Sequence, residues 1–165
     1  MRPRLAAALL LLSAGAARGE ERCGPLFVIA RSLNANVVLY EAGLRSDGTL
    51  DPAKPLTVTW RLDAQDGRRE GLNFVERIRA YGVDVGSRRE DDTWRVTVRA
   101  LPTRPLVLHQ GTGCPFVTAE VAGRDAILRR VFVTARGGLL PRVASVELTG
   151  VDQETALPVT ELFTP

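Results

Sequence analysis

The sequence has 165 residues, and its 22 Lys and Arg side chains against 19 Asp and Glu give a formal net charge of +3. The excess comes from Arg2, Arg4 and Arg18, so residues 20–165 are close to neutral. A neutral chain lacks the basic footprint of a nucleic-acid-binding protein and the main electrostatic attraction to anionic lipid. A hydrophobic fraction of 45% argues against disorder. Residues 20–165 suffice for a single domain with its own core.

The first nineteen residues have the order of a secretory signal peptide. Two arginines lie in residues 1–4, an apolar run (LAAALLLL) follows at 5–12, and small residues fill 13–19. We expect cleavage before Glu20, and a cut after Ala16 is the alternative. The apolar run is far shorter than the roughly 20 residues of a membrane span, and no later segment is apolar enough to replace it. The pattern predicts a periplasmic or secreted protein without a transmembrane span.

The mature chain contains two cysteines, Cys23 and Cys114. In an oxidising compartment they are expected to form one disulfide. The alternative makes Cys114 a nucleophile, with His109 five residues away, although no thiolate-stabilising motif is visible. The charged residues 20–22 before Cys23 do not match the small, apolar lipobox of a lipoprotein. The protein is therefore not expected to be lipidated.

Most of the mature chain has the pattern of short β-strands. Residues 56–62 alternate, with Leu56, Val58 and Trp60 on one face, and residues 93–101 alternate in the same way. Expected strands cover 26–31, 36–42, 56–62, 93–101, 106–109, 116–121, 127–134, 143–149 and 157–163. A hairpin is expected around 123–125. Strands joined by short turns predict a mostly β, antiparallel sandwich or barrel.

One segment, residues 71–80, is expected to form the single short α-helix. Its apolar residues recur at helical spacing, at Phe74, Val75 and Ile78. Asn73 fits the N-cap position, and Glu76 three residues later completes a capping box. Gly82 fits the end of the helix. We expect this helix to pack on the sheet or to close one end of it.

The sequence contains few groups for metal or nucleophilic chemistry. His109 is the only histidine, so a zinc site is not expected, and no serine lies in a G-x-S-x-G motif. Residues 111–113 precede a strand instead of a helix, which is not a phosphate loop. No metal and no cofactor is expected. Two of Glu41, Glu76 and Glu120 form a glycosidase-like pair if they meet in a cavity, but surface ion pairs with arginines are the simpler interpretation.

Polar residues of the first half form the candidate ligand-binding set. It comprises Arg31, Asn34, Asn36, Trp60, Glu76, Arg77 and Tyr81. Each has a local alternative: the asparagines cap a turn, Glu76 caps the helix, Arg77 pairs with an acid and Tyr81 packs. If they line one pocket beside Trp60, the mixture of amide, guanidinium and aromatic groups suits a small polar ligand.

At these residues the chain resembles a bacterial exported family, the domain of unknown function 4833. The resemblance lies in segments 29–42 (IARSLNANVVLYEA), 47–62, 72–85 and 145–161. Its most specific parts are the N-x-N-x-V-x-Y run at 34–40 and the E-R-x-x-A-Y-G run at 76–82. The resemblance implies an exported domain of this size and supplies no reaction, ligand or catalytic residue.

Three functional hypotheses follow. The first is an exported, non-catalytic binding module whose ligand is a small polar molecule or an envelope protein. The second is a carboxylate-dependent hydrolase that uses Glu41 or Glu76. The third is a structural or interaction protein of the cell envelope that pairs through a sheet edge or an apolar patch.

Overall fold

The computed structural model describes residues 23–137 and 142–165. The expected signal peptide, residues 1–19, and the cleavage site before Glu20 lie outside these ranges. The described chain forms eleven strands, one α-helix and one 3-10 helix. The strands are β1 (Phe27–Arg31), β2 (Asn34–Ala42), β3 (Leu56–Leu62), β4 (Arg68–Gly71), β5 (Val83–Arg88), β6 (Thr93–Val98), β7 (Leu106–His109), β8 (Phe116–Val121), β9 (Arg124–Arg136), β10 (Arg142–Asp152) and β11 (Pro158–Phe163). The helices are α1 (Phe74–Arg79) and η1 (Asp63–Gln65). The prediction of a mostly β fold with one short helix is confirmed.

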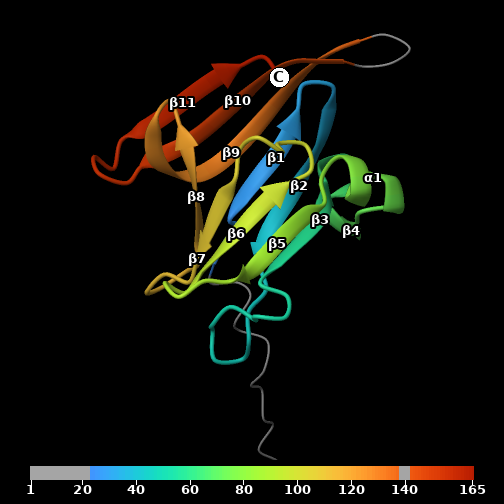
Figure 1. Ribbon diagram of the computed structural model, residues 1–165. Coiled ribbons are helices and arrows are strands. Elements are labelled where there is room, and N and C mark those ends of the chain that lie inside the picture. The colour runs from blue at the N-terminus through green and yellow to red at the C-terminus, as the bar shows by residue number, and fades with distance from the viewer. Residues whose placement is uncertain (1–22, 138–141) are drawn as a thin grey trace, which may run out of the picture.

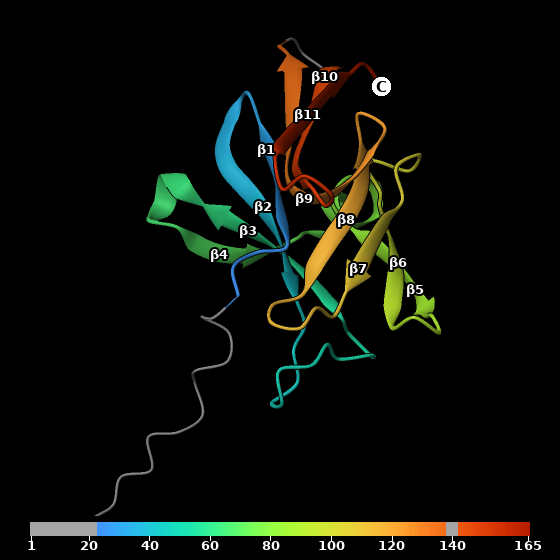
Figure 2. The same ribbon diagram turned by 90° about the vertical axis from the view of Figure 1, so that its left-hand side faces the viewer.

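All eleven strands belong to one strongly curled sheet (Figure 1). Its main path runs β4-β3-β2-β1-β9-β8-β7-β6-β5, and β10 and β11 continue from the other edge of β9. The start of β9 pairs with β8, its later part pairs with β1, and β10 pairs along its length. The β1–β9 pair is parallel, so the sheet is mixed. The sequence had predicted an antiparallel arrangement, which the other strand pairs have. Figure 2 shows β2–β4 on one side and β5–β8 on the other, which gives a half-barrel.

The core lies on the concave side of this sheet. Its largest fully buried side chains include Tyr40, Phe27 and Ile29 from β1 and β2 and Leu106 and Leu108 from β7. The rings of Phe27 and Tyr40 stack with their centroids 4.2 Å apart. These residues come from the apolar runs that the sequence marks as strands, and buried apolar area is the main stabilising contribution to such a fold.

The helix begins as the capping pattern predicts. The Asn73 side-chain Oδ1 accepts from the Glu76 backbone N–H at 2.9 Å, and the Glu76 carboxylate accepts from the Asn73 N–H at 3.0 Å. After α1 the chain turns sharply at Gly82. An added Cβ there would lie 1.8 Å from the carbonyl oxygen of Arg77, so this close approach requires glycine.

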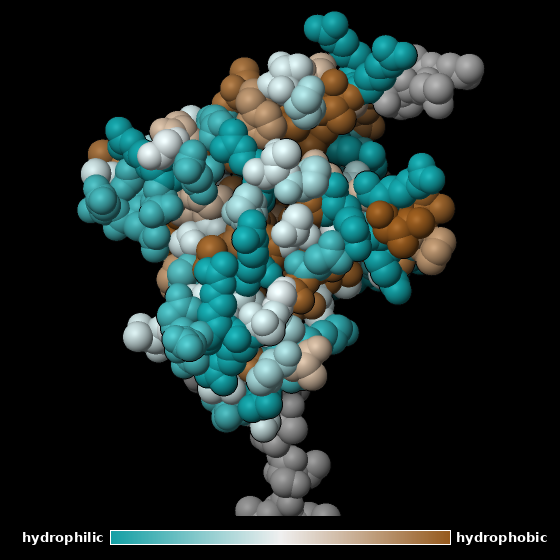
Figure 3. Space-filling view, in the orientation of Figure 1, coloured by the Kyte–Doolittle hydropathy of each residue, from teal (hydrophilic) through white to brown (hydrophobic). Residues whose placement is uncertain are grey.

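The prediction that the helix packs on the sheet or closes one end of it is wrong. Phe74, Val75 and Ile78 have exposed fractions of 73%, 61% and 45%, and α1 contributes no buried residue. The flanking residues Leu72 and Tyr81 are buried instead and attach the segment to the core. Figure 3 shows apolar surface over α1 with hydrophilic surface around it. The helical spacing therefore marks an exposed apolar face.

The predicted disulfide is confirmed, since Cys23 and Cys114 are bonded to each other. It ties the segment before β1 to the loop between β7 and β8. The nucleophile alternative for Cys114 is thereby wrong. His109 stacks on Phe116 at 4.6 Å, and its Nε2 lies 2.9 Å from the Thr118 Oγ1. Burial lowers the pKa of His109, an effect that nearby Asp91 opposes.

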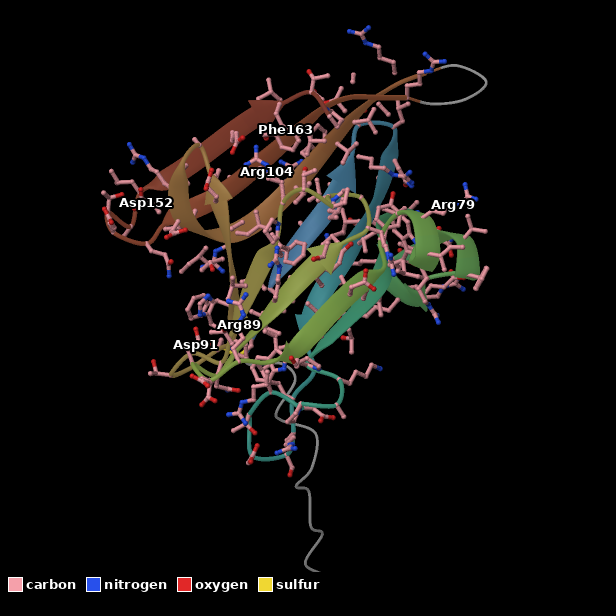
Figure 4. All side chains as sticks on the ribbon, in the orientation of Figure 1. Arg79, Arg89, Asp91, Arg104, Asp152 and Phe163 are labelled. Atoms are coloured by element: carbon pink, nitrogen blue, oxygen red, sulfur yellow. A yellow bond between two sulfur atoms is a disulfide. The ribbon has the colours of Figure 1, made fainter. Side chains whose placement is uncertain are left out.

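The final hairpin is anchored by a carboxylate of β11. Glu161 makes a bidentate ion pair with Arg104 in the β6–β7 connection and accepts from the Ala122 N–H at 2.7 Å. The Arg104 guanidinium lies 4.9 Å from the ring centroid of Phe163, and Figure 4 shows the two side by side. The Ala122 N–H, followed by the Arg104 guanidinium, holds the pKa of Glu161 below its usual range.

We expect this anchor to make stability fall in acid. Backbone N–H groups of Thr155 and Glu154 and the Arg124 side chain likewise lower the pKa of Asp152 on β10. Because both folded-state pKa values are depressed, the stabilisation is complete above about pH 5 and is lost as the pH falls through the folded values. The midpoint of urea unfolding should be flat near neutrality and should decline below about pH 4.

The variant Glu161→Gln should lose about 1 to 2 kcal/mol at pH 7 and should show a shallower acid decline. Glu154→Gln is the matched control, because that exposed carboxylate lies on the same hairpin and has no side-chain partner within the described ranges. Parallel pH profiles for Glu161→Gln and the unaltered protein would contradict the assignment.

Candidate functional site

A polar pocket of about 240 Å³ opens between β2, β3, β4 and α1. Its lining residues are Arg31, Asn34, Asn36, Trp60, Leu62, Glu70, Gly71, Asn73 and Glu76. Five of the seven candidate residues therefore lie together, namely Arg31, Asn34, Asn36, Trp60 and Glu76. The other two lie outside the lining. Arg77 donates to the Leu72 carbonyl at 3.2 Å, and Tyr81 lies against the Trp60 ring.

Strand register places these side chains on one face of the sheet. Trp60 on β3 pairs with Val38 on β2 and with Glu70 on β4. Since alternate residues of a strand share a face, Asn34 and Asn36 lie on the same side of the sheet as Val38. The bend that leads from β4 into α1 then brings Asn73 and Glu76 over this face.

Arg31 forms one wall of the pocket. Its guanidinium lies 5.7 Å from the Trp60 ring centroid and 5.6 Å from that of Tyr81. The two rings meet edge to face with their centroids 5.1 Å apart, so the cation lies against both rings at once. The Nε of Arg31 is buried and has no hydrogen-bond partner within the described ranges. The arginine is thus fixed by aromatic contacts instead of an ion pair.

Glu76 connects the helix to the strand. Its Oε2 accepts from the Trp60 Nε1–H at 3.1 Å and from the Asn73 N–H at 3.0 Å. A carboxylate that receives both donors fixes the indole and the first turn of α1 together. This residue combines the capping role with a position on the pocket wall.

The pocket contains all three asparagines of the chain, Asn34, Asn36 and Asn73. Each side-chain oxygen accepts from a backbone N–H. The donors are Asn36 for Asn34 at 2.9 Å, Ala64 for Asn36 at 3.4 Å and Glu76 for Asn73 at 2.9 Å. No amino group of the three has a protein partner in the part of the chain that the structure describes. Three NH₂ groups at this pocket therefore keep their donor capacity.

The tyrosines behind the pocket have a structural role. The Tyr40 hydroxyl donates to the Tyr81 carbonyl oxygen at 2.8 Å. Burial raises the pKa of Tyr40 and, against the nearby Arg31, also that of Tyr81. Both hydroxyls are therefore protonated near neutral pH. The Tyr40 bond fixes the backbone that carries Tyr81 and hence one of the two rings that hold Arg31.

The two carboxylates of the hydrolase hypothesis do not form a pair. Glu41 pairs with Arg69 and lies 3.5 Å from the Thr59 Oγ1. Thr59 and Trp60 are consecutive on β3 and point to opposite faces, so Glu41 and Glu76 lie on opposite sides of the sheet. Glu70 is the second carboxylate at the pocket, and Arg68 approaches it to only 3.7 Å. No group of three or more His, Cys, Asp or Glu within residues 23–137 and 142–165 is arranged to hold a metal ion.

Several lining residues were missed at the sequence level. Glu70 and Gly71 lie on β4, whose charged sequence RREG gives no strand signal. Asn73 was identified only as a helix cap. The available signal was composition, since the chain has three asparagines and two of them already belonged to the candidate set.

The comparisons with known proteins identify the family. The model of the family described as "Domain of unknown function (DUF4833)" matches residues 27–162, and the chain belongs to this family. The resemblance found in the sequence is thereby confirmed. Neither the curated proteins nor the solved structures contain a match. None of the helices in the described ranges is long and apolar enough to cross a membrane.

Proposed function

We propose that this family member is an exported, non-catalytic binding module that holds a small, neutral, hydroxyl-rich molecule of the monosaccharide class in the polar pocket. The observation that carries the proposal is the convergence of all three asparagines on one pocket, where their amino groups have no partner among the described residues. Amide donors beside a guanidinium and two carboxylates offer hydrogen-bond donors and acceptors at close quarters.

The chemistry of the lining favours a neutral ligand. The pocket has one cation, Arg31, and two carboxylates, Glu70 and Glu76. An anion would meet an excess of negative charge there. Hydroxyl groups both donate and accept, so a polyol matches carboxylate acceptors and amide donors at once. The volume of about 240 Å³ lies below the roughly 300–1,000 Å³ of drug-sized sites, which suits a single sugar ring.

The hydrogen bonds of Glu76 favour a binding role over a catalytic one. Both of its N–H donors fix structure, one from Trp60 and one from the helix cap at Asn73. A general acid or base needs a carboxyl group whose proton is free to move to the reacting atom. Export is supported by the charged, apolar and small order of residues 1–19, and the Cys23–Cys114 disulfide fits an oxidising compartment such as the periplasm.

Asparagine-to-aspartate variants test the proposal, because aspartate keeps the oxygen that binds the backbone and removes the NH₂ donor. We expect Asn34→Asp, Asn36→Asp and Asn73→Asp to keep the free energy of unfolding within about 0.5 kcal/mol. Isothermal titration calorimetry with glucose, mannose and N-acetylglucosamine should give saturable binding of at least one neutral sugar. Each variant should weaken that binding about two- to tenfold.

The matched control is Gln65→Glu, which makes the same chemical change at an exposed residue of η1 outside the pocket. It should bind the sugar as the unaltered protein does. Glucuronate, the anionic comparison, should bind more weakly than the neutral sugars. If no neutral sugar binds at millimolar concentration, or if the aspartate variants bind as tightly as the unaltered protein, the proposal is wrong. The search would then turn to protein partners.

A further inference from the structure

A second pocket lies on the other side of Arg31 and has a different character. Its volume is about 340 Å³, within the range of ligand sites. Its lining residues are Ile29, Arg31, Arg79, Ala80, Tyr81, Ala100, Leu101, Val131, Val133, Val143, Val146 and Pro165. We refer to it as the apolar pocket.

Register explains why its floor is apolar. Ile29 on β1 pairs with Val131 on β9, and Val133 pairs with both Arg31 and Val146. Directly paired residues share a face of the sheet, so these side chains form one surface at the end of the half-barrel. The segments that follow α1 and β6 border it through Tyr81 and Leu101. In this apolar floor Ile29, Val131 and Val146 are buried, whereas Val133 and Val143 remain partly exposed to the pocket.

The only charged side chains in this lining belong to two arginines. Arg31 contacts aromatic rings, and its buried Nε has no acceptor among the described residues. Arg79 lies in the last turn of α1, as Figure 4 shows, and has no ion pair or hydrogen bond within the described ranges. No acidic side chain belongs to the lining, and its two guanidinium groups outnumber the α-carboxylate of the last residue, Pro165, so the pocket keeps a net positive charge beside apolar surface.

From this combination we infer that the apolar pocket binds a single-chain amphipathic anion, an alkyl carboxylate whose chain occupies the apolar part of the pocket and whose head group meets Arg31 and Arg79. The carboxylate supplies an acceptor to the guanidinium of Arg31, for which the described residues provide none. The alkyl chain covers the apolar side chains of the lining that remain partly exposed, Val133 and Val143. This inference concerns a site separate from the polar pocket, and only Arg31 and the aromatic wall lie between the two.

Calorimetric titration with butanoate, hexanoate, octanoate and decanoate below their micelle concentrations tests the apolar part. Affinity should rise about fourfold per added methylene and should stop rising once the pocket is full. Octanol, which has the same chain without the charge, should bind more weakly than octanoate. An absence of octanoate binding, or equal affinity for octanol and octanoate, would overturn the inference.

Two variants locate the site. Arg79→Gln should weaken octanoate binding about two- to fivefold and leave octanol binding unchanged. Ala100→Phe adds a large side chain at an exposed lining position and should remove measurable octanoate binding without disturbing the core. Arg129→Gln is the control, because it removes the same charge from an exposed position of β9 outside the lining. Unchanged octanoate binding in both Arg79→Gln and Ala100→Phe would contradict the assignment.

The two sites are separable in one experiment. Asn34→Asp should change sugar binding and leave octanoate binding intact, and Arg79→Gln should do the opposite. Arg31 is unsuitable for this purpose, because it lines both pockets. In the unaltered protein, octanoate binding without binding of any sugar would contradict the proposed function alone, and sugar binding without octanoate binding would contradict the present inference alone.

Discussion

The variant Trp60→Ala is expected to lower the free energy of unfolding by about 3 to 5 kcal/mol, the usual cost of removing a buried large aromatic side chain. Only 8% of Trp60 is exposed, and its ring contacts Tyr81, Arg31 and Glu76. For a domain of this size the change corresponds to a fall of roughly 10 to 15 °C in the Tm. Calorimetry and urea unfolding measure it.

Phe74→Ala is the matched control, because this aromatic side chain on α1 is 73% exposed. It should change the free energy of unfolding by no more than about 0.5 kcal/mol. Equal effects of Trp60→Ala and Phe74→Ala would mean that Trp60 is not part of the core. Such a result would also remove the rigid aromatic support of Arg31 on which both pockets depend.

The second large effect is expected from the disulfide. Replacing Cys23 and Cys114 together by serine opens a loop closed across 91 residues. The loop-entropy model gives about 4 to 4.7 kcal/mol for such a crosslink, and measured losses in small secreted domains are roughly 2 to 5 kcal/mol. The double variant should therefore unfold at a clearly lower urea concentration than the oxidised protein.

Reduction of the unaltered protein provides the control. With dithiothreitol present, its urea midpoint should move to that of the double serine variant, and the variant itself should not respond. A serine variant as stable as the oxidised protein would contradict a stabilising role for the crosslink. The disulfide would then serve only to hold the segment before β1 in place.

Local patterns predicted much of the fold. For strands with alternating or continuous apolar residues, the bounds predicted from the sequence lie within a few residues of the observed ones, as β3 and β7 show. The capping box at Asn73 and Glu76 fixed the start of α1. These features depend on neighbouring residues, which the sequence displays directly.

Features that depend on distant pairing were missed. β4 has four exposed residues and forms an end of the main sheet path, so it has no apolar face that a pattern can reveal. The parallel contact of β1 with β9 joins residues about a hundred positions apart, and no local signal specifies it. The apolar spacing of α1 predicted a buried face, but the capping box and buried Leu72 and Tyr81 hold the helix with that face exposed.

Only part of the candidate site was predicted, because only some of its residues are close together in the sequence. Arg31, Asn34 and Asn36 are close in sequence and border one turn, and they share a pocket in the structure. Glu70 was missed because its strand was missed. The apolar pocket was not predicted at all, because its floor is assembled from β1, β9 and β10 through register.

The most direct test of the polar pocket uses the fact that the chain has only three asparagines. In protein labelled with ¹⁵N at asparagine, the side-chain NH₂ signals come from Asn34, Asn36 and Asn73 alone. Titration with the sugar that binds most tightly in calorimetry should shift all three NH₂ pairs saturably, with one common dissociation constant. Sugar binding that leaves the three NH₂ pairs unmoved, or an absence of any shift with every sugar tested, would contradict the proposed function.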